Sequence, residues 1–173
     1  MTDVTGQSTL VLGGARSGKS RFAEELALAA TGQRIYIATA EALDDEMTAR
    51  IAHHRRQRGE DWLTVECPMA LPEAIATHAA PGVLMLVDCL TLWLSNLMLA
   101  QADVAAEVTR LTAAMAVAPG TLVLVSNEVG QGIVPDNALA RQFRDEAGRL
   151  NQAVARAAHT VWFLTAGIPA RLK

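Results

Sequence analysis

The residues GGARSGKS at positions 13–20 have the spacing of a phosphate-binding loop, in which the glycines precede a lysine and a serine. Glycines let the backbone wrap around a phosphate, and the amides at the start of the following helix then face the anion. Lys19 would reach the β- and γ-phosphates of a nucleoside triphosphate, and Ser20 would ligate Mg²⁺. The predicted nucleotide-binding residues of this loop are Gly13, Gly14, Ala15, Arg16, Ser17, Gly18, Lys19 and Ser20.

A candidate nucleophile, one of two adjacent histidines, lies in the sequence ARIAHHRRQRGEDW at positions 49–62. On a helix, His54 shares a face with Met47 and Ile51, whereas His53 points about 100° away. The guanidinium groups that follow disfavour a protonated imidazole, and a neutral imidazole is a competent nucleophile. The same arginines could hold a triphosphate. The residues alone leave an alternative open, a solvated helix end whose histidines and arginines interact favourably with the helix dipole.

Two further sets of polar residues follow predicted apolar strands. Asp88 ends the most apolar strand, where a carboxylate could support Mg²⁺ or a water, although it could equally cap the following helix. The segment SNEVGQGIVPDN at 126–137 also follows a buried strand. Asn127 and Glu128 could shape a ligand pocket there, or the segment could be a turn in which Asp136 or Asn137 caps the next helix.

These residues are positioned by alternating strands and helices, which predict an α/β fold, P-loop NTPase-like, with a mainly parallel sheet and helices on both faces. In such sheets ligands bind at the carboxyl ends of the strands. The predicted strands are 9–14, 34–39, 62–67, 82–88, 120–130 and 160–167, with a short tail after the last. The predicted helices are 19–31, 44–59, 71–79, about 90–101, 103–117 and 137–159.

Composition limits the class of protein. The chain has 173 residues, of which 51% are hydrophobic, and a net charge of −3, which together predict a single globular domain over residues 1–173 and no general attraction for nucleic acid. Residues 83–100 are apolar, but Asp88 interrupts them, so we expect a strand and a helix and not a membrane span. Cys67 and Cys89 lack metal-binding spacing and are expected to be free buried thiols. No signal peptide is recognisable, and we expect a cytoplasmic protein.

Four segments together resemble the bifunctional adenosylcobinamide kinase / adenosylcobinamide-phosphate guanylyltransferase family of cobalamin biosynthesis. They are GGARSGKS, YIATAEALDDEMTARIAHHRRQR, DWLTVE and SNEVGQGIVPDNALARQFRDEAGRLNQAVA. The resemblance extends from residue 9 to about 168. The phosphate loop is shared by many proteins, whereas the blocks around the histidine pair and around NEVGQGIVP are far more specific.

The resemblance implies two reactions. A nucleoside triphosphate, ATP or GTP, phosphorylates adenosylcobinamide, and GMP from GTP is then transferred to adenosylcobinamide phosphate through a guanylyl-histidine at His54. It also implies Mg²⁺ as the cofactor and a homotrimer. Besides the loop at 13–20, the implied nucleotide contacts are Ala38, Thr39, Ala40, Arg55, Arg56, Gln57, Arg58, Glu66 and Asp88. The two acids suit guanine, whose N1–H and amino group are donors. A kinase without guanylylation and a nucleotide-binding switch without chemistry are the alternatives.

Overall fold

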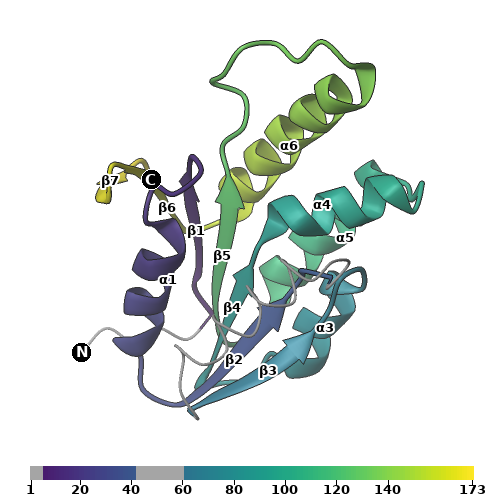
Figure 1. The fold of residues 1–173 in the computed structure, drawn as a ribbon. Helices are drawn as coiled ribbons and strands as arrows, with labels where there is room; N and C mark the ends of the chain where they lie inside the picture. Colours follow the sequence, from purple (N-terminus) through teal and green to yellow (C-terminus); the bar gives the residue numbers. More distant parts are fainter. Residues whose placement is uncertain (1–5, 42–60) are drawn as a thin grey trace.

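The computed structural model describes residues 6–41 and 61–173, and its strands form one seven-stranded sheet (Figure 1). The strand order is β3-β2-β4-β5-β1-β6-β7, and every neighbouring pair is parallel except β6 and β7. The central strands are almost entirely apolar and buried, as expected for a parallel sheet covered on both faces. Their bounds are Ser8–Gly13 (β1), Gln33–Ala38 (β2), Trp62–Glu66 (β3), Val83–Asp88 (β4), Thr121–Asn127 (β5), Thr160–Thr165 (β6) and Ile168–Arg171 (β7).

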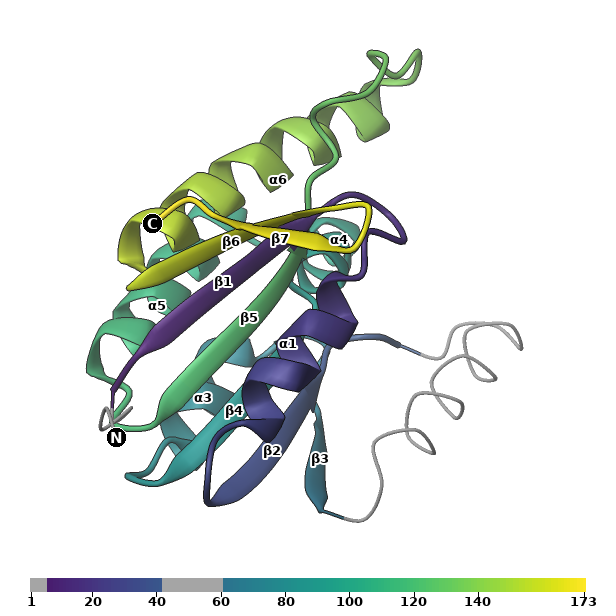
Figure 2. The same cartoon turned by 90° about the vertical axis from the view of Figure 1, so that its left-hand side faces the viewer.

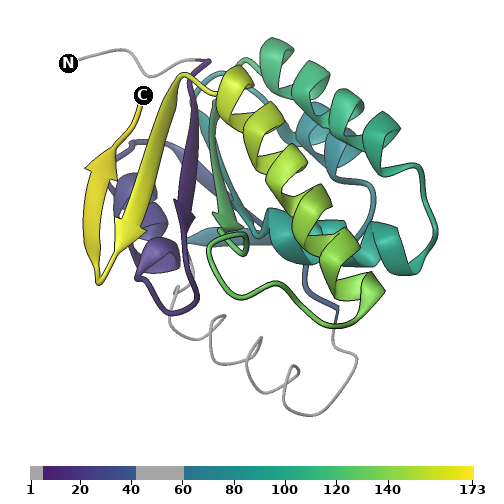
Figure 3. The same ribbon diagram turned by 90° about the horizontal axis from the view of Figure 1, so that it is seen from above.

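The described helices cover the two faces unequally. Helix α1 (Lys19–Leu28) packs on one face, and Figures 2 and 3 show the other four described helices on the opposite face. Each predicted helix within the described residues is present, with bounds shifted by a few residues at most. The four are α3 (Leu71–His78), α4 (Leu90–Leu99), α5 (Val104–Val117) and α6 (Ala138–Ala157).

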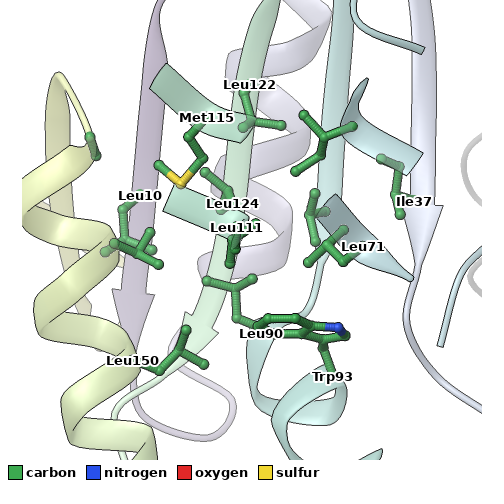
Figure 4. Packing of buried hydrophobic residues seen from close by; sticks show 14 of the residues in the cluster. Leu10, Ile37, Leu71, Leu90, Trp93, Leu111, Met115, Leu122, Leu124 and Leu150 are labelled. Carbon is green, nitrogen blue, oxygen red and sulfur yellow. The ribbon is translucent and has the colours of Figure 1, made fainter. Parts of the chain in front are cut away.

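The larger apolar cluster lies between the sheet and helices α3 to α6 (Figure 4). Trp93 is fully buried in it, and its indole Nε1 donates a hydrogen bond to the Met69 carbonyl at 2.7 Å. Both cysteines are free and buried, as predicted. Among the helices of the described residues, none is both long enough and apolar enough to cross a bilayer.

The C-terminal tail differs from the prediction. Residues 168–171 form β7, an edge strand antiparallel to β6, whereas the sequence predicted a strand over 160–167 and a short tail. Ala166 and Gly167 both have positive φ, 51° and 80°, and form the tight turn between Thr165 and Ile168. Strand β5 also ends at Asn127 and not at residue 130, so Glu128 begins a loop at the carboxyl edge of the sheet.

Candidate functional site

The loop between β1 and α1 adopts a wrapped backbone that its glycines allow. Gly18 has φ 92° and Arg16 has φ 56°, so two left-handed residues stand two positions apart in the loop, a backbone pattern typical of anion-binding loops. Gly13 must lack a side chain, because a Cβ there would lie 2.4 Å from Ser17 Oγ and 2.8 Å from the Leu164 carbonyl oxygen. The loop leads directly into the N-terminus of α1, whose first amides have no acceptor within the helix.

Two polar side chains of this loop are buried. Lys19 is 9% exposed, and its ammonium group donates to the Gly14 carbonyl at 3.0 Å, across the loop. Ser17 is also buried, and its Oγ is the single buried side-chain polar atom without a hydrogen-bond partner in the described part of the chain. An unsatisfied buried hydroxyl is costly, and a bound phosphate oxygen would satisfy it.

At the carboxyl ends of β2, β3 and β4, the two predicted acids flank Ala38 on the neighbouring strands. Ala38 is in register with Glu66 on β3 and with Asp88 on β4. Side chains alternate along a strand, and Trp62, Ala38 and Leu86 belong to the cluster under α1. Glu66 and Asp88 therefore lie on the α1 face of the sheet, the face on which the phosphate-loop helix packs.

The Asp88 carboxylate accepts a hydrogen bond from a residue of the neighbouring strand β2. The Tyr36 hydroxyl donates to the Asp88 carboxylate at 3.1 Å. The alternative that Asp88 caps α4 is wrong, because Cys89 occupies the N-cap position and no side chain caps this helix. Two strand spacings, about 10 Å, separate β4 from β1, and four, about 19 Å, separate β3 from β1. Asp88 therefore lies nearer the phosphate loop than Glu66 does.

A buried threonine and a half-buried asparagine connect these strand ends to α4. Thr39 Oγ1 donates to the Cys89 carbonyl at 2.7 Å and accepts from the Cys89 amide at 2.8 Å. The Asn96 side-chain amide donates to the carbonyls of Thr39 and Pro68, at 2.9 and 3.0 Å. Because the Thr39 side chain is fully buried in this network, Ala38 and Ala40 are the more accessible members of the predicted contact segment. Asn96 was not predicted as a site residue, because its signal in the sequence is a single amide within an apolar helix.

The loop after β5 contacts the phosphate loop. The Glu128 amide donates to the Gly13 carbonyl at 3.0 Å, and the Glu128 carboxylate accepts from the Gly130 amide at 2.6 Å. Asn137 caps α6 by accepting from the Ala140 amide at 2.8 Å, which confirms one of the two predicted caps. Asn127 and Glu128 thus lie beside residues 13–20, at the edge where a ligand was predicted.

The oxygen donors at this edge suit Mg²⁺. The hydroxyl of Ser20 and the carboxylate of Asp88 are hard ligands of the kind that Mg²⁺ prefers alongside substrate phosphates. Within residues 6–41 and 61–173, no three or more His, Cys, Asp or Glu side chains form a metal-binding group. The predicted nucleophile His54 and the contacts Arg55, Arg56, Gln57 and Arg58 lie outside the described residues.

Curated relatives match almost the whole chain. The bifunctional adenosylcobalamin biosynthesis protein CobP of Pseudomonas aeruginosa is 48% identical, and the match covers 95% of this chain and 96% of that protein. The proteins named bifunctional adenosylcobalamin biosynthesis protein CobU from Salmonella typhimurium and Escherichia coli are 47% and 45% identical, each over 95% of this chain and 98% of the relative.

Solved structures with the same fold are more distant in sequence. A KaiC-like protein from Pyrococcus horikoshii superposes with a TM-score of 0.53 at 12% identity, covering 92% of this chain and 71% of that one. An ATPase of a bacterial type III secretion system superposes with a TM-score of 0.57 at 14% identity, and the match covers 96% of this chain and 57% of that one. At this identity these likenesses show the fold alone, an α/β fold that is P-loop NTPase-like. The model of the family described as cobinamide kinase / cobinamide phosphate guanyltransferase matches residues 9–172. Together with the relatives, this match shows that the chain belongs to that family of bifunctional enzymes.

Proposed function

We propose that the chain catalyses two linked transfers at the carboxyl edge of its sheet. In the first, the hydroxyl oxygen of the aminopropanol arm of adenosylcobinamide bonds to the γ-phosphorus of a nucleoside triphosphate. The bond from that phosphorus to the β–γ bridging oxygen breaks, the nucleoside diphosphate leaves, and the hydroxyl proton is released. Lys19 and the loop amides hold the phosphates in line for this attack, so catalysis is mainly positioning and charge stabilisation.

In the second transfer, an imidazole nitrogen of His54 bonds to the α-phosphorus of GTP and pyrophosphate leaves. A phosphate oxygen of adenosylcobinamide phosphate then attacks the same phosphorus, the bond to His54 breaks, and adenosylcobinamide-GDP is formed. Arg55, Arg56 and Arg58 would stabilise the negative charge on the transferring group.

The observation that best supports this proposal is the arrangement of polar groups along one edge of the sheet. The phosphate loop with its buried Lys19 stands at β1, Asp88 ends β4, and Glu66 ends the more distant β3. The phosphates and the base of a nucleotide are at opposite ends of the molecule. We therefore propose that Asp88 serves the phosphates and their metal, whereas Glu66 accepts hydrogen bonds from the guanine.

The metal proposed for both reactions is Mg²⁺. Ser20 and Asp88 would hold it, directly or through water, beside the β- and γ-phosphates. When bound, Mg²⁺ neutralises charge that develops on the phosphate oxygens. The chain's own contribution is the backbone of residues 13–18 with its two left-handed residues, whose amides would bind the same oxygens as Lys19.

Guanylylation is tested by incubating the protein with Mg²⁺ and GTP labelled at the α-phosphate, and by measuring label on the denatured chain. We expect acid-labile, alkali-stable label, as for a phosphoramidate, on the wild type and on His53→Ala. His54→Ala is expected to carry none. A wild-type chain that binds GTP but takes up no label would contradict the guanylyl-histidine.

Phosphorylation is tested separately with ATP or GTP labelled at the γ-phosphate and adenosylcobinamide as acceptor. His54→Ala should retain this activity, because the kinase step does not use the nucleophile, whereas Lys19→Ala should lose it. Transfer of γ-phosphate without α-label would identify a kinase alone. Binding without either reaction would identify a nucleotide switch.

We also propose that the chain works as a homo-oligomer, a trimer by its family resemblance, in the cytoplasm. Apolar surface at the ends of α4 and α6 supports an association surface. A cavity of about 350 Å³ there is lined by Met98, Leu99, Leu139 and Phe143, among others, and Leu99 and Leu139 are 66% and 59% exposed. Analytical ultracentrifugation tests this. A single trimer is expected for the wild type, whereas Leu139→Glu should sediment as a smaller species.

A further inference from the structure

The end of β5 presents different chemistry to the two faces of the sheet. Leu122 and Leu124 pack in the cluster beneath α5 and α6, whereas Val123 and Val125 pack in the cluster beneath α1. Continuing this alternation, Ser126 faces α6 and Asn127 faces the α1 side. The Ser126 hydroxyl bears this out by donating to Asn151 of α6 at 2.7 Å.

A buried polar network fixes the backbone of Asn127 from the α6 side. The Asn127 amide donates to the Thr91 hydroxyl at 2.7 Å, and the Asn127 carbonyl accepts from the Asn151 side chain at 3.1 Å. Thr91 and Asn151 are 7% and 6% exposed. Since both backbone groups of Asn127 are held by buried partners, its Cα is fixed in position, and buried networks of this kind are rigid.

The neighbouring strands define what lies beside the Asn127 side chain. Strand β5 runs between β1 and β4, and Asn127 is in register with Gly13, the first residue of the phosphate loop. On the other side, Asp88 pairs with Val125, two residues before Asn127 on the same face. The Asn127 side chain therefore projects between the phosphate loop and the Asp88 strand. It is half-buried, and none of the side-chain hydrogen bonds among residues 6–41 and 61–173 involves its amide group.

We propose that the side-chain amide of Asn127 donates a hydrogen bond to the γ-phosphate of the bound nucleotide. In a phosphate-loop site the lysine reaches the β- and γ-phosphates. Asp88, at the end of β4, would help to hold the metal that accompanies them. A γ-phosphate bound in this way would lie between the loop and Asp88, and the strand order places Asn127 there. This inference rests on the proposed nucleotide site and adds a residue that distinguishes a triphosphate from a diphosphate.

Binding measurements test the inference without the corrinoid. Calorimetry with Mg²⁺ would compare GDP with the β,γ-imido analogue of GTP. We expect the wild type to bind the analogue more tightly than GDP. Asn127→Ala should weaken binding of the analogue by about tenfold, the loss expected for one hydrogen bond to a charged group. The affinity for GDP should stay within about twofold of the wild-type value. Asn127→Asp keeps the shape but adds a negative charge, and should weaken the analogue further.

Gln152→Ala is the matched control, because it removes an exposed side-chain amide from α6 and should change neither affinity. If Asn127 were only structural, Asn127→Ala would lower the melting temperature and weaken both ligands together, which would overturn the inference. An unchanged ratio of the two affinities would also overturn it, as would a wild type without preference for the triphosphate. If the wild type prefers the triphosphate analogue to GDP and Asn127→Ala loses this preference, the inference stands. It stands even if the wild type transfers no phosphate to adenosylcobinamide, a result that would overturn the proposed function.

Discussion

At the scale of single residues, the structure shows how Asp88 is oriented. The Tyr36 hydroxyl, on the adjacent strand, donates to its carboxylate, and the Tyr36 ring also packs edge-on against Trp62 with centroids 6.2 Å apart. The orientation of the carboxylate thus depends on a phenol whose ring belongs to the core beneath α1. The sequence predicted a role for Asp88 from its place at a strand end. The hydrogen bond from Tyr36 could not be predicted from the sequence, because Tyr36 and Asp88 are 52 positions apart in the chain.

Tyr36→Phe tests this orientation while keeping the ring in the core. We expect Mg²⁺-dependent nucleotide affinity to fall by about three- to tenfold, as one hydrogen bond to a carboxylate is lost. Calorimetry with and without Mg²⁺ measures the effect. The control is Tyr36→Leu, which also removes the ring and should lower the melting temperature clearly. Unchanged Mg²⁺-dependent affinity in Tyr36→Phe would show that the hydroxyl has no part in orienting Asp88.

The two cysteines are expected to be inert in the folded chain. Burial raises the pKa of the Cys89 thiol, and the charge of Asp88 raises it further, while burial and then Glu73 raise the pKa of Cys67. A raised pKa keeps each thiol protonated at a pH where a free cysteine is already partly thiolate, and the thiolate is the reactive form. At pH 8 we expect slow reaction with a disulfide reagent in the native chain and rapid reaction of two thiols in guanidinium. Equal rates would contradict the burial of these thiols.

At the scale of elements, the sequence predicts what depends on local chemistry. Helix α6 begins where its asparagine cap and apolar spacing indicate. Strand β7 was missed because its turn uses Ala166 at positive φ, which an alanine rarely adopts, and because Pro169 argues against a strand. Pro169 is tolerated because β7 is the sheet edge. Asn151 was missed as a network residue, since it lies between Leu150 and Val154 on a helix face read only for its apolar residues.

Asn137→Ala tests the cap of α6. The side chain satisfies the Ala140 amide, which is otherwise without an acceptor at the helix start, so its loss should cost about 1 kcal/mol. For a chain of this length the melting temperature should fall by about 2–4 °C. Asn137→Ser keeps a capping oxygen and should restore most of the loss. An Ala variant as stable as the wild type would show that water replaces the cap without penalty.

At the scale of the whole molecule, the strand order determines which residues can form one site. Residues from β1, β4 and β5 meet at one edge although Gly13 and Asn127 are more than a hundred positions apart. Alternation of strands and helices predicted the parallel sheet and its ligand edge, so the loop at 13–20 and Asp88 were placed correctly at that edge. The order of strands across the sheet, which separates Glu66 from the loop, is a long-range property that no local pattern carries.

This arrangement predicts that nucleotide binding stabilises the entire chain, because the loop and the strand ends it contacts belong to the folded sheet alone. A ligand at one hundred times its dissociation constant adds about 2.7 kcal/mol of stability, which for this length is roughly a 5–10 °C rise in melting temperature. Thermal unfolding with Mg²⁺ and GTP measures the rise. Lys19→Ala should show a much smaller rise at the same GTP concentration, since Lys19 bridges the loop and the phosphates in the proposed site. His54→Ala should keep most of it, because it removes a nucleophile and leaves the phosphate loop intact. If Lys19→Ala is stabilised by GTP as strongly as the wild type, the phosphates do not bind at residues 13–20.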